Sequence, residues 1–412
     1  MLTNKSKSAV SLTVIVAALG YFVDIYDLLL FSIIRVPSLE SFGLSSNLIK
    51  TEGESIITWQ MMGLLLGGIL WGIMGDKRGR MSVLFGSILL YSVANLLNGF
   101  VQDVHQYKWV RFMAGIGLAG ELGAGITLVS EVVSKERRGI ITSLVAGIGL
   151  TGAVFAFVIK EHFEWRTCYF IGAAMGFLLL LLRVSVLESG LFNNLKESQT
   201  ARGDISMLFF NRKRLKRYLL NMLIGLPTWL VIGMLITFSK EFGSCMNIKD
   251  KIDPGKAIMY AYVMISIGDI AIGFISHWFK SRKAALLLFY LITVIFMVLF
   301  FTAQHNGSAK NMYWICAGLG LGTGFWAIFV TMAAEQFGTN LRATATTTIP
   351  NMVRGMLAIF ILPLRDAFEH FLHLDYYTSG WATCLVVMAL SFFALIFVEE
   401  TYGKDLNFVE ED

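Results

Sequence analysis

The chain has 412 residues, of which 56% are hydrophobic and 15% charged, and its mean hydropathy is +0.65. An ordinary soluble domain is about 45–50% apolar and about 25% charged, so this composition excludes a soluble globular protein and indicates one embedded in a lipid bilayer. The net charge of +5 requires no nucleic-acid partner, because basic loops beside the membrane account for it.

Apolar runs long enough to cross a bilayer recur twelve times along the chain. A helix rises about 1.5 Å per residue, so about 20 residues cross a hydrocarbon core of about 30 Å. We therefore predict twelve transmembrane helices. Their approximate spans are residues 9–34, 56–75, 81–101, 107–132, 139–159, 166–186, 216–238, 256–277, 283–303, 311–334, 343–364 and 376–398.

The first predicted span contains the segment GYFVDIYDLLLF, residues 20–31, which carries Asp24 and Asp27. Each carboxylate costs about 2.5–3.5 kcal/mol at the centre of a bilayer on insertion scales. Residues three apart share one face of a helix, so both side chains are expected to face the interior of the bundle. We expect these acids to pair with bases. Four other ionisable residues lie well inside predicted spans, namely Arg111, Glu121, Asp269 and Arg354.

A long polar stretch, from Glu188 to Arg217, separates the first six spans from the last six. Its basic cluster is typical of a cytoplasmic loop. We predict three parts, namely an N-terminal six-helix bundle (1–187), a linker loop (188–215) and a C-terminal six-helix bundle with a short tail (216–412).

The two halves also repeat each other in sequence. The motifs GIMGDKRGR and GFISHWFKSRK begin 201 residues apart (273 minus 72), and a glutamate followed seven residues later by an arginine recurs with an offset of 204 residues (335 minus 131). Such internal symmetry is typical of secondary transporters, whose substrate site lies near the bilayer midplane between the repeats.

The orientation follows from the distribution of lysine and arginine. With the N-terminus inside, the inner segments hold 20 of these residues and the outer loops 11. Positively charged loops stay in the cytoplasm, so both termini are predicted to be cytoplasmic in a multi-pass protein of the plasma membrane, the inner membrane of a bacterium. The first apolar run is too long for a cleavable signal peptide and lacks a small-residue cleavage site.

Several of these motifs resemble those of the major facilitator superfamily. GIMGDKRGR is similar to its loop signature between the second and third helices, and RFMAGIGLAGE, from Arg111, is similar to the fourth-helix signature of its sugar-porter, metabolite:proton and phosphate:proton symporter branches. VLESG and VEETYGKDL resemble the endings of its sixth and twelfth helices, with Gly190 where proline is usual. The resemblance implies an all-α fold of 12 transmembrane helices in two pseudo-symmetric six-helix bundles.

The loop motifs are expected to form a conformational latch on the cytoplasmic side. Carboxylates there can accept hydrogen bonds from exposed N–H groups at helix ends, and the basic residues can pair with acids on neighbouring helices. Contacts that exist in one conformation set the balance between inward-open and outward-open states. In the second copy of the loop motif His277 replaces the aspartate. The alternative to a latch is that the motif forms a tight turn with a solvated basic face. The predicted latch residues are Gly72, Asp76, Lys77, Arg78, Gly79, Arg80, Glu131, Arg138, Glu335 and Arg342.

The segment GYFVDIYDL resembles the first-helix pattern of metabolite:proton and phosphate:proton symporters. The resemblance implies that Asp27 binds a proton, that Arg111 is its partner, and that Glu121 lies near the substrate. An arginine lowers the pKa of a nearby aspartate and desolvation raises it, so a motion that separates Asp27 from Arg111 would load and release a proton. Asp24 would tune Asp27 as a neighbour of like charge. The alternative is a static salt bridge between the first and fourth helices.

The substrate class follows from the cations. Arg111 and Arg354 are predicted to be the only cations deep in the spans, and a guanidinium suits a carboxylate or a phosphate. A small anion or zwitterion is expected. Apart from Arg111, Arg354 and Glu121, the candidate substrate-binding residues are Tyr21, Trp229, Asp269 and Trp326, although tryptophan in membrane helices commonly packs or anchors at the interface.

The sequence contains no phosphate-binding GxxxxGK[ST] loop and no zinc motif, so we predict neither an ATP-driven transporter nor a metal site, and no enzyme. We expect a proton-coupled symporter of a small anionic or zwitterionic metabolite, such as an organic acid, that works by alternating access and uses no cofactor besides the coupling proton. The expected partners are this substrate and the lipid bilayer, with a monomer as the functional unit. The alternatives are a proton-driven exporter of a polycarboxylate or metal chelator, and a membrane sensor or scaffold that does not transport.

Overall fold

The computed structural model describes residues 4–78, 80–121, 138–188, 211–302, 305, 307–338, 341–404 and 410. Within these ranges the side chains of residues 4–13, 75–78, 80–81, 138–140, 184–188 and 343 are not described.

All the regular elements in the described ranges are helices. In the first half of the chain these are α1 (Asn4–Glu40), α2 (Ser46–Arg78), α3 (Arg80–Asn98), α4 (Val104–Leu118), α6 (Arg138–Leu150), α7 (Gly152–His162) and α8 (Trp165–Glu188). In the second half they are α10 (Arg212–Trp229), η1 (Leu230–Ile236), α11 (Ser239–Cys245), α12 (Pro254–Phe279), α13 (Arg282–Thr302), α14 (Ala309–Thr323), α15 (Trp326–Gln336), α16 (Arg342–Met356), η2 (Leu357–Ile361), α17 (Leu362–Phe371) and α18 (Tyr376–Phe397).

In the part of the chain that the structure describes, consecutive helices join end to end into twelve rods, and each predicted span lies wholly or partly on one of them. In the described residues, ten rods are long and apolar enough to cross a bilayer by length and composition. The other two are α3, which is a shorter apolar helix, and α4, whose predicted span continues beyond the described residues. The protein is therefore an all-α membrane protein, as the composition predicted.

Four rods are interrupted near their middles, which the hydropathy pattern does not show. A break at Thr151 separates α6 from α7, and another at Gly324 and Phe325 separates α14 from α15. The π-helical turns η1 and η2 interrupt the other two. Interrupted helices and π-turns occur frequently at functional sites in membrane transporters.

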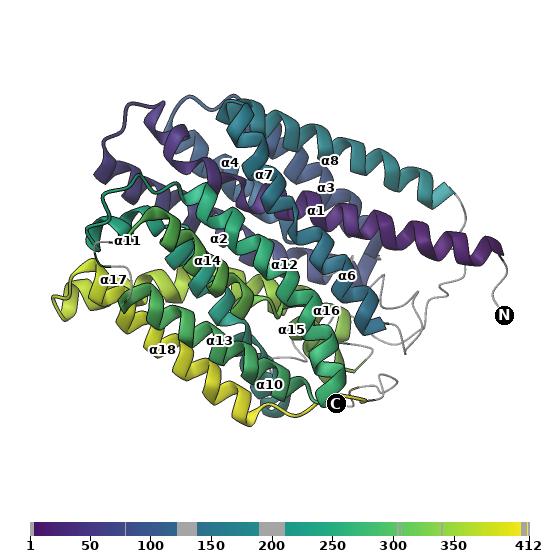
Figure 1. The fold of residues 1–412 in the computed structure, drawn as a ribbon. Coiled ribbons are helices and arrows are strands. Elements are labelled where there is room, and N and C mark those ends of the chain that lie inside the picture. Colours follow the sequence, from purple (N-terminus) through teal and green to yellow (C-terminus); the bar gives the residue numbers. More distant parts are fainter. Residues whose placement is uncertain are drawn as a thin grey trace.

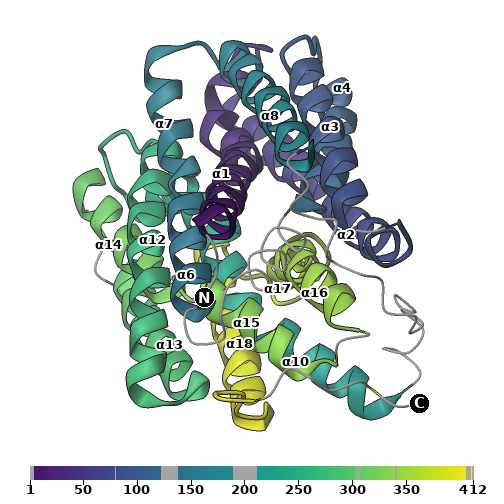
Figure 2. The same ribbon diagram turned by 90° about the vertical axis from the view of Figure 1, so that its right-hand side faces the viewer.

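The rods form two six-helix bundles, one from each half of the chain. In Figure 1 the helices up to α8 occupy the upper part of the molecule and the green to yellow helices from α10 onward occupy the lower part. Seen along the helices in Figure 2, α1 lies near the middle with α6, α7 and α8 around it. Both ends of the chain lie at one end of the bundles, called here the terminal end, and the opposite end is called the distal end.

Helices pack closely where glycine removes the side chain. A Cβ atom added to Gly63 on α2 would lie 2.1 Å from the carbonyl oxygen of Phe112 on α4, and one added to Gly115 would lie 2.2 Å from that of Gln60. Two seams join the bundles, one between α2 and α16 and the other between α12 and the α6–α7 rod. In addition, Asn351 on α16 donates from Nδ2 to the carbonyl of Ala119, which directly follows α4, at 2.7 Å.

Capping side chains start several helices at the distal end. Asp103 Oδ1 accepts from the backbone N–H of Gln106 at 2.8 Å, and Asp253 Oδ1 accepts from that of Gly255 at 2.9 Å, with Pro254 in the first turn. Such caps satisfy N–H groups that have no partner within the helix. These two caps fix where α4 and α12 begin, and thereby how far along these helices Arg111 and Asp269 lie.

Candidate substrate and coupling site

The ionisable residues that the sequence places inside spans are all buried. Asp24, Asp27, Asp269 and Arg111 are fully buried, and Glu121 and Arg354 are at most 2% exposed. The four predicted carboxylates and two predicted guanidinium groups therefore all point away from the surface of the protein that lipid would cover. A third guanidinium, described below, joins them.

Arg111 binds the backbone of α1 at Asp27. Its Nη2 atom donates to the carbonyl oxygen of Asp27 at 3.0 Å, and its Nε atom donates to Gln60 Oε1 at 3.3 Å. Neither carboxylate oxygen of Asp27 accepts a hydrogen bond from the described residues. The carboxylate lies over Gly172 on α8, next to the amide of Asn95. Arg111 is thus a neighbour of Asp27, as expected, but it contacts the main chain and not the carboxylate.

Asp27 and Arg111 belong to the same bundle, on α1 and α4. A rigid rocking of one bundle against the other would leave their separation unchanged. The expected separation of this pair during transport therefore requires a rearrangement within the first bundle.

Glu121 forms an ion pair with Arg183 on α8. Both side chains are at least 95% buried, and they lie against Gly20 on α1. The prediction that Arg111 and Arg354 are the only deep cations is therefore wrong, since Arg183 is a third. Its position five residues before Glu188, at the polar end of the sixth span, concealed it in the sequence.

The pair formed by Asp24 joins the two bundles. Asp24 lies on α1, and its Oδ2 atom is 3.7 Å from Nη2 of Arg354 on α16. This separation is too long for a hydrogen bond, and neither oxygen of Asp24 accepts one within the described part of the chain. The sequence predicts that Asp24 tunes Asp27 as a neighbour of like charge, whereas in the structure Asp24 faces a cation of the other half.

Asp269 on α12 caps a helix in the interrupted rod. Its Oδ1 atom accepts from the backbone N–H of Ala327 at 2.9 Å, in the first turn of α15. The break at Gly324 exposes these N–H groups inside the protein, where water cannot satisfy them. A capping role therefore accounts for one oxygen of the carboxylate, while Oδ2 has no partner among the described residues.

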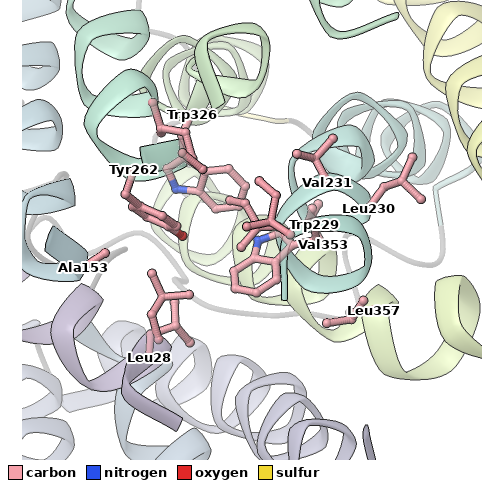
Figure 3. Packing of buried hydrophobic residues seen from close by; sticks show 14 of the residues in the cluster. Leu28, Ala153, Trp229, Leu230, Val231, Tyr262, Trp326, Val353 and Leu357 are labelled. Atoms are coloured by element: carbon pink, nitrogen blue, oxygen red, sulfur yellow. The ribbon is translucent and has the colours of Figure 1, made fainter. Parts of the chain in front are cut away.

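An aromatic ring lies against Arg354. The guanidinium lies over the ring of Trp326, 5.8 Å from its centroid. Figure 3 shows Trp326 beside Tyr262, with Trp229 across from them and Leu28 of α1 on the side of the first bundle. Tyr21 packs against Gly149 on α6 and is 4% exposed. The three aromatic residues predicted for the site, Tyr21, Trp229 and Trp326, are thus buried in the core, and two of them lie close to one another.

Several hydrogen-bond donors in this region have no acceptor within the described ranges. They are Nε and Nη1 of Arg354 and the indole Nε1 atoms of Trp229 and Trp326. An unpaired buried donor costs about 1–3 kcal/mol, so proteins rarely keep several together without a role for them. Arg354 thus combines unpaired donors with the adjacent face of Trp326, and this combination suits a small planar anion.

The predicted latch is described only in part. Gly79 and Glu131 lie outside the described residues, and the side chains of Asp76, Lys77, Arg78, Arg80 and Arg138 are not described. Gly72 lies near Thr348 on α16, in the seam between the bundles.

In the second half, Glu335 binds Arg282 at 3.1 Å and accepts from Thr401 at 2.6 Å. Arg342 donates from Nε to the carbonyl oxygen of Ala334 at 2.9 Å. His277, which replaces the expected aspartate, lies 3.0 Å from the hydroxyl of Tyr402. The second-half motif thus ties the end of α15 to the chain that follows α18.

Among the described residues, three ion pairs join the bundles at the distal end. Each has one partner in the first half of the chain and one in the second, so the pairs close this end of the molecule. They are Arg35–Glu241 at 2.8 Å, Lys160–Asp253 at 2.5 Å and Glu54–Arg365 at 2.9 Å. None of these six residues stands out in the sequence, because each lies just outside a predicted span, where charged residues are common.

The described residues contain no group of three or more histidine, cysteine or acidic side chains arranged to hold a metal ion.

Comparison with known proteins gives consistent matches over almost the whole chain. The family model described as Major Facilitator Superfamily matches residues 12–363. The chain is 24% identical to the niacin transporter NiaP of Acinetobacter baylyi, over 95% of this chain and 94% of that protein. It is 23% identical to a gentisate transporter of Corynebacterium glutamicum, over 92% of this chain and 86% of that one. The solved structure of the proton:xylose symporter XylE is similar in fold, with a TM-score of 0.71 and 16% identity over 97% of this chain and 98% of that chain.

Proposed function

Because the chain belongs to the major facilitator superfamily and is a transporter rather than an enzyme, we propose that it is a proton-coupled symporter of a small organic acid. In this proposal the substrate binds between the two bundles, at Arg354, and is released by alternating access. The terminal end, with both termini, lies in the cytoplasm of a bacterial cell, as the distribution of lysine and arginine indicates.

The observation that carries this proposal is the set of unpaired donors around Arg354. A carboxylate binds a guanidinium in a bidentate manner through Nη2 together with either Nε or Nη1. In Arg354 both Nε and Nη1 have no acceptor among the described residues, and Nη2 lies 3.7 Å from Asp24. Beside this charge contact, the ring of Trp326 adds a flat apolar face, and Trp229 lies across from Trp326 in Figure 3. The site therefore favours an anion with a planar apolar body over a neutral polyol.

The names of the relatives support the same class of substrate. Niacin and gentisate are both carboxylic acids that carry an aromatic ring, and the transporters named for them align with nearly the whole of this chain. We therefore propose an aromatic monocarboxylate as the substrate class within the organic acids.

Transport in proteoliposomes tests this proposal. An imposed inward proton gradient should drive accumulation of radiolabelled nicotinate or gentisate, and a protonophore should abolish it. Arg354→Lys should lower the initial rate at least about tenfold, because lysine cannot form the bidentate contact. Arg166→Lys is the matched control, since Arg166 donates to backbone carbonyls at the distal end, away from the site.

Two results would overturn the proposal. Absence of accumulation of any aromatic carboxylate would exclude the substrate class, and accumulation that requires the opposite gradient would indicate export. The orientation has its own test at Cys245, which is exposed at the distal end while the other three cysteines are buried. A membrane-impermeant maleimide should label Cys245 in intact cells if the distal end faces outward.

A further inference from the structure

We propose that Asp24 occupies Arg354 until the substrate carboxylate displaces it, and that the displaced Asp24 takes up the transported proton. This inference rests on the proposed function, since it describes how the same site links substrate to proton. It replaces the expectation that Asp27 and Arg111 perform the coupling.

The geometry of Arg354 supports the exchange. Within the described residues Asp24 is the carboxylate within ion-pair distance of this guanidinium, at 3.7 Å. The contact is long and contains no hydrogen bond, and in the same part of the chain Nε and Nη1 of Arg354 are unpaired. A substrate carboxylate could therefore make shorter, charge-assisted hydrogen bonds than Asp24 does. Asp24 thus neutralises Arg354 but leaves hydrogen-bond donors of the guanidinium without an acceptor among the described residues.

Burial determines what happens to Asp24 after displacement. Its side chain is fully buried and neither oxygen accepts a hydrogen bond from the described residues, so Arg354 is the contact that stabilises its charge. A buried carboxylate that loses its cation becomes neutral by taking up a proton. In the exchange Arg354 loses its contact with Asp24 and binds the substrate carboxylate instead. Asp24 then gains one proton from the aqueous phase on the open side.

Two of the other acids near Asp24 already have partners. Glu121 pairs with Arg183 within the first bundle, and one oxygen of Asp269 caps α15. The charged and titratable groups that face Asp24 or lie in its electrostatic neighbourhood are Arg354 on α16, Glu121 just after α4, Arg183 on α8, Tyr91 on α3, Tyr262 and Asp269 on α12, and Tyr21 and Asp27 on α1.

The position of the pair also suits alternating access. Asp24 lies in the first bundle and Arg354 in the second, so rocking of the bundles changes their separation directly. Asp27 and Arg111 lie in one bundle, and Arg111 holds a carbonyl group, whose charge does not change. The Asp24–Arg354 pair is therefore sensitive to both the substrate and the conformation.

Ligand binding as a function of pH tests the inference on the purified full-length protein. The probe is benzoate, with nicotinate and gentisate as alternatives, and calorimetry between about pH 6 and about pH 8 keeps the benzoate carboxylate ionised. If one proton enters with each anion, the affinity of the wild type should rise about tenfold for each unit of pH decrease. Asp24→Asn should bind benzoate with no such pH dependence.

Two further variants make the result specific. Asp27→Asn, the same substitution one turn away on α1, should keep the pH dependence of the wild type. Asp24→Glu restores a titratable group and should also keep the pH dependence of the wild type. This variant shows that a loss of pH dependence in Asp24→Asn is not caused by misfolding.

The outcomes separate the inference from the function on which it rests. If the pH dependence persists in Asp24→Asn, or is lost in Asp27→Asn, Asp24 is not the switch, even though the protein binds the acid. If none of the three carboxylates binds the wild type at either pH, the proposed substrate class fails and the inference fails with it.

Discussion

The ion pair between Glu54 and Arg365 should control how long the distal end stays closed. Glu54 lies on α2 in the first bundle and Arg365 lies on α17 in the second, and two hydrogen bonds of 2.9 Å join their side chains. The pair forms when the distal ends of the bundles meet. Glu54→Gln removes its charge with little change in shape, so it should shift the conformational balance toward the distal-open state.

The size of the shift follows from the surroundings of the pair. Removing one partner of a fully buried ion pair costs about 3–5 kcal/mol, whereas a hydrogen bond to a charged group contributes about 1.5–3 kcal/mol. The side chain of Glu54 is 17% exposed, and Arg365 keeps Asp366 at 2.6 Å as a second anionic partner. Both facts favour the lower end of the range. We expect a loss of about 1.5 kcal/mol, which changes the ratio of closed to open molecules about tenfold.

Glu52→Gln provides a matched control two residues away on the same helix. Glu52 pairs with Lys108 at 2.7 Å, and both belong to the first bundle, so this pair moves as a unit. Spin labels on the exposed Cys245 and on a cysteine introduced at Glu164 would report the distance between the bundles at the distal end. The distance distribution should shift outward in Glu54→Gln and stay unchanged in Glu52→Gln. Equal distributions in both variants would refute the assignment of this pair to the closed state.

Three further predictions concern packing, capping and the C-terminal tail. Gly115→Val should lower the free energy of unfolding by about 1–3 kcal/mol, because a Cβ atom there meets the carbonyl oxygen of Gln60 at 2.2 Å, and thermal unfolding in detergent would measure it. Asp269→Ala should cost about 1 kcal/mol in the same assay, whereas Asp269→Asn should be tolerated, because asparagine also caps helices. The third prediction concerns Glu410: burial raises its pKa, but the hydrogen bonds from Arg217 and the Gly338 N–H and the charges of Arg217 and Arg214 together outweigh burial and leave the pKa below the usual value. The tail contact is therefore present at neutral pH and lost as the pH falls through that lowered pKa, which hydrogen exchange of the tail would show.

Each of these predictions has an outcome that would contradict it. Unchanged unfolding of Gly115→Val would mean that α2 and α4 separate without cost. Loss of ligand binding in Asp269→Asn at unchanged stability would assign the carboxylate to the substrate rather than to α15. Tail exchange that is the same at low and neutral pH, or that is unaffected by Glu410→Gln, would show that the carboxylate does not hold the tail.

Much of the architecture could be predicted from the chain alone. Hydropathy is a property of each segment, and a bilayer sets the length of the segments that cross it, so twelve apolar runs predict twelve rods. The cost of a charge in lipid likewise predicts that Asp24, Asp27 and Arg354 face inward. Both inferences need no knowledge of which helix neighbours which, and the structure agrees with both.

The partners of these charges could not be predicted in the same way. Arg183 lies near a polar helix end, so its pairing with Glu121 depends on how α8 is rotated against α4. Asp269 becomes a cap because a break at Gly324 and Phe325 lets α15 begin in the middle of the rod, and the continuous apolar pattern conceals this break. Helix rotation and helix breaks depend on packing between segments far apart in the chain. Neither can be predicted from a single apolar run.

The amino-acid sequence by itself determined that this protein crosses a membrane many times, in two related halves, with acids and guanidinium groups turned away from lipid. Tertiary structure alone decided that Asp24 faces Arg354 across the two bundles while Asp27 shares one bundle with Arg111. The physical reason is that burial of a charge depends on the surrounding solvent, which composition predicts, whereas its pairing depends on distances between helices, which arise when the two bundles pack together.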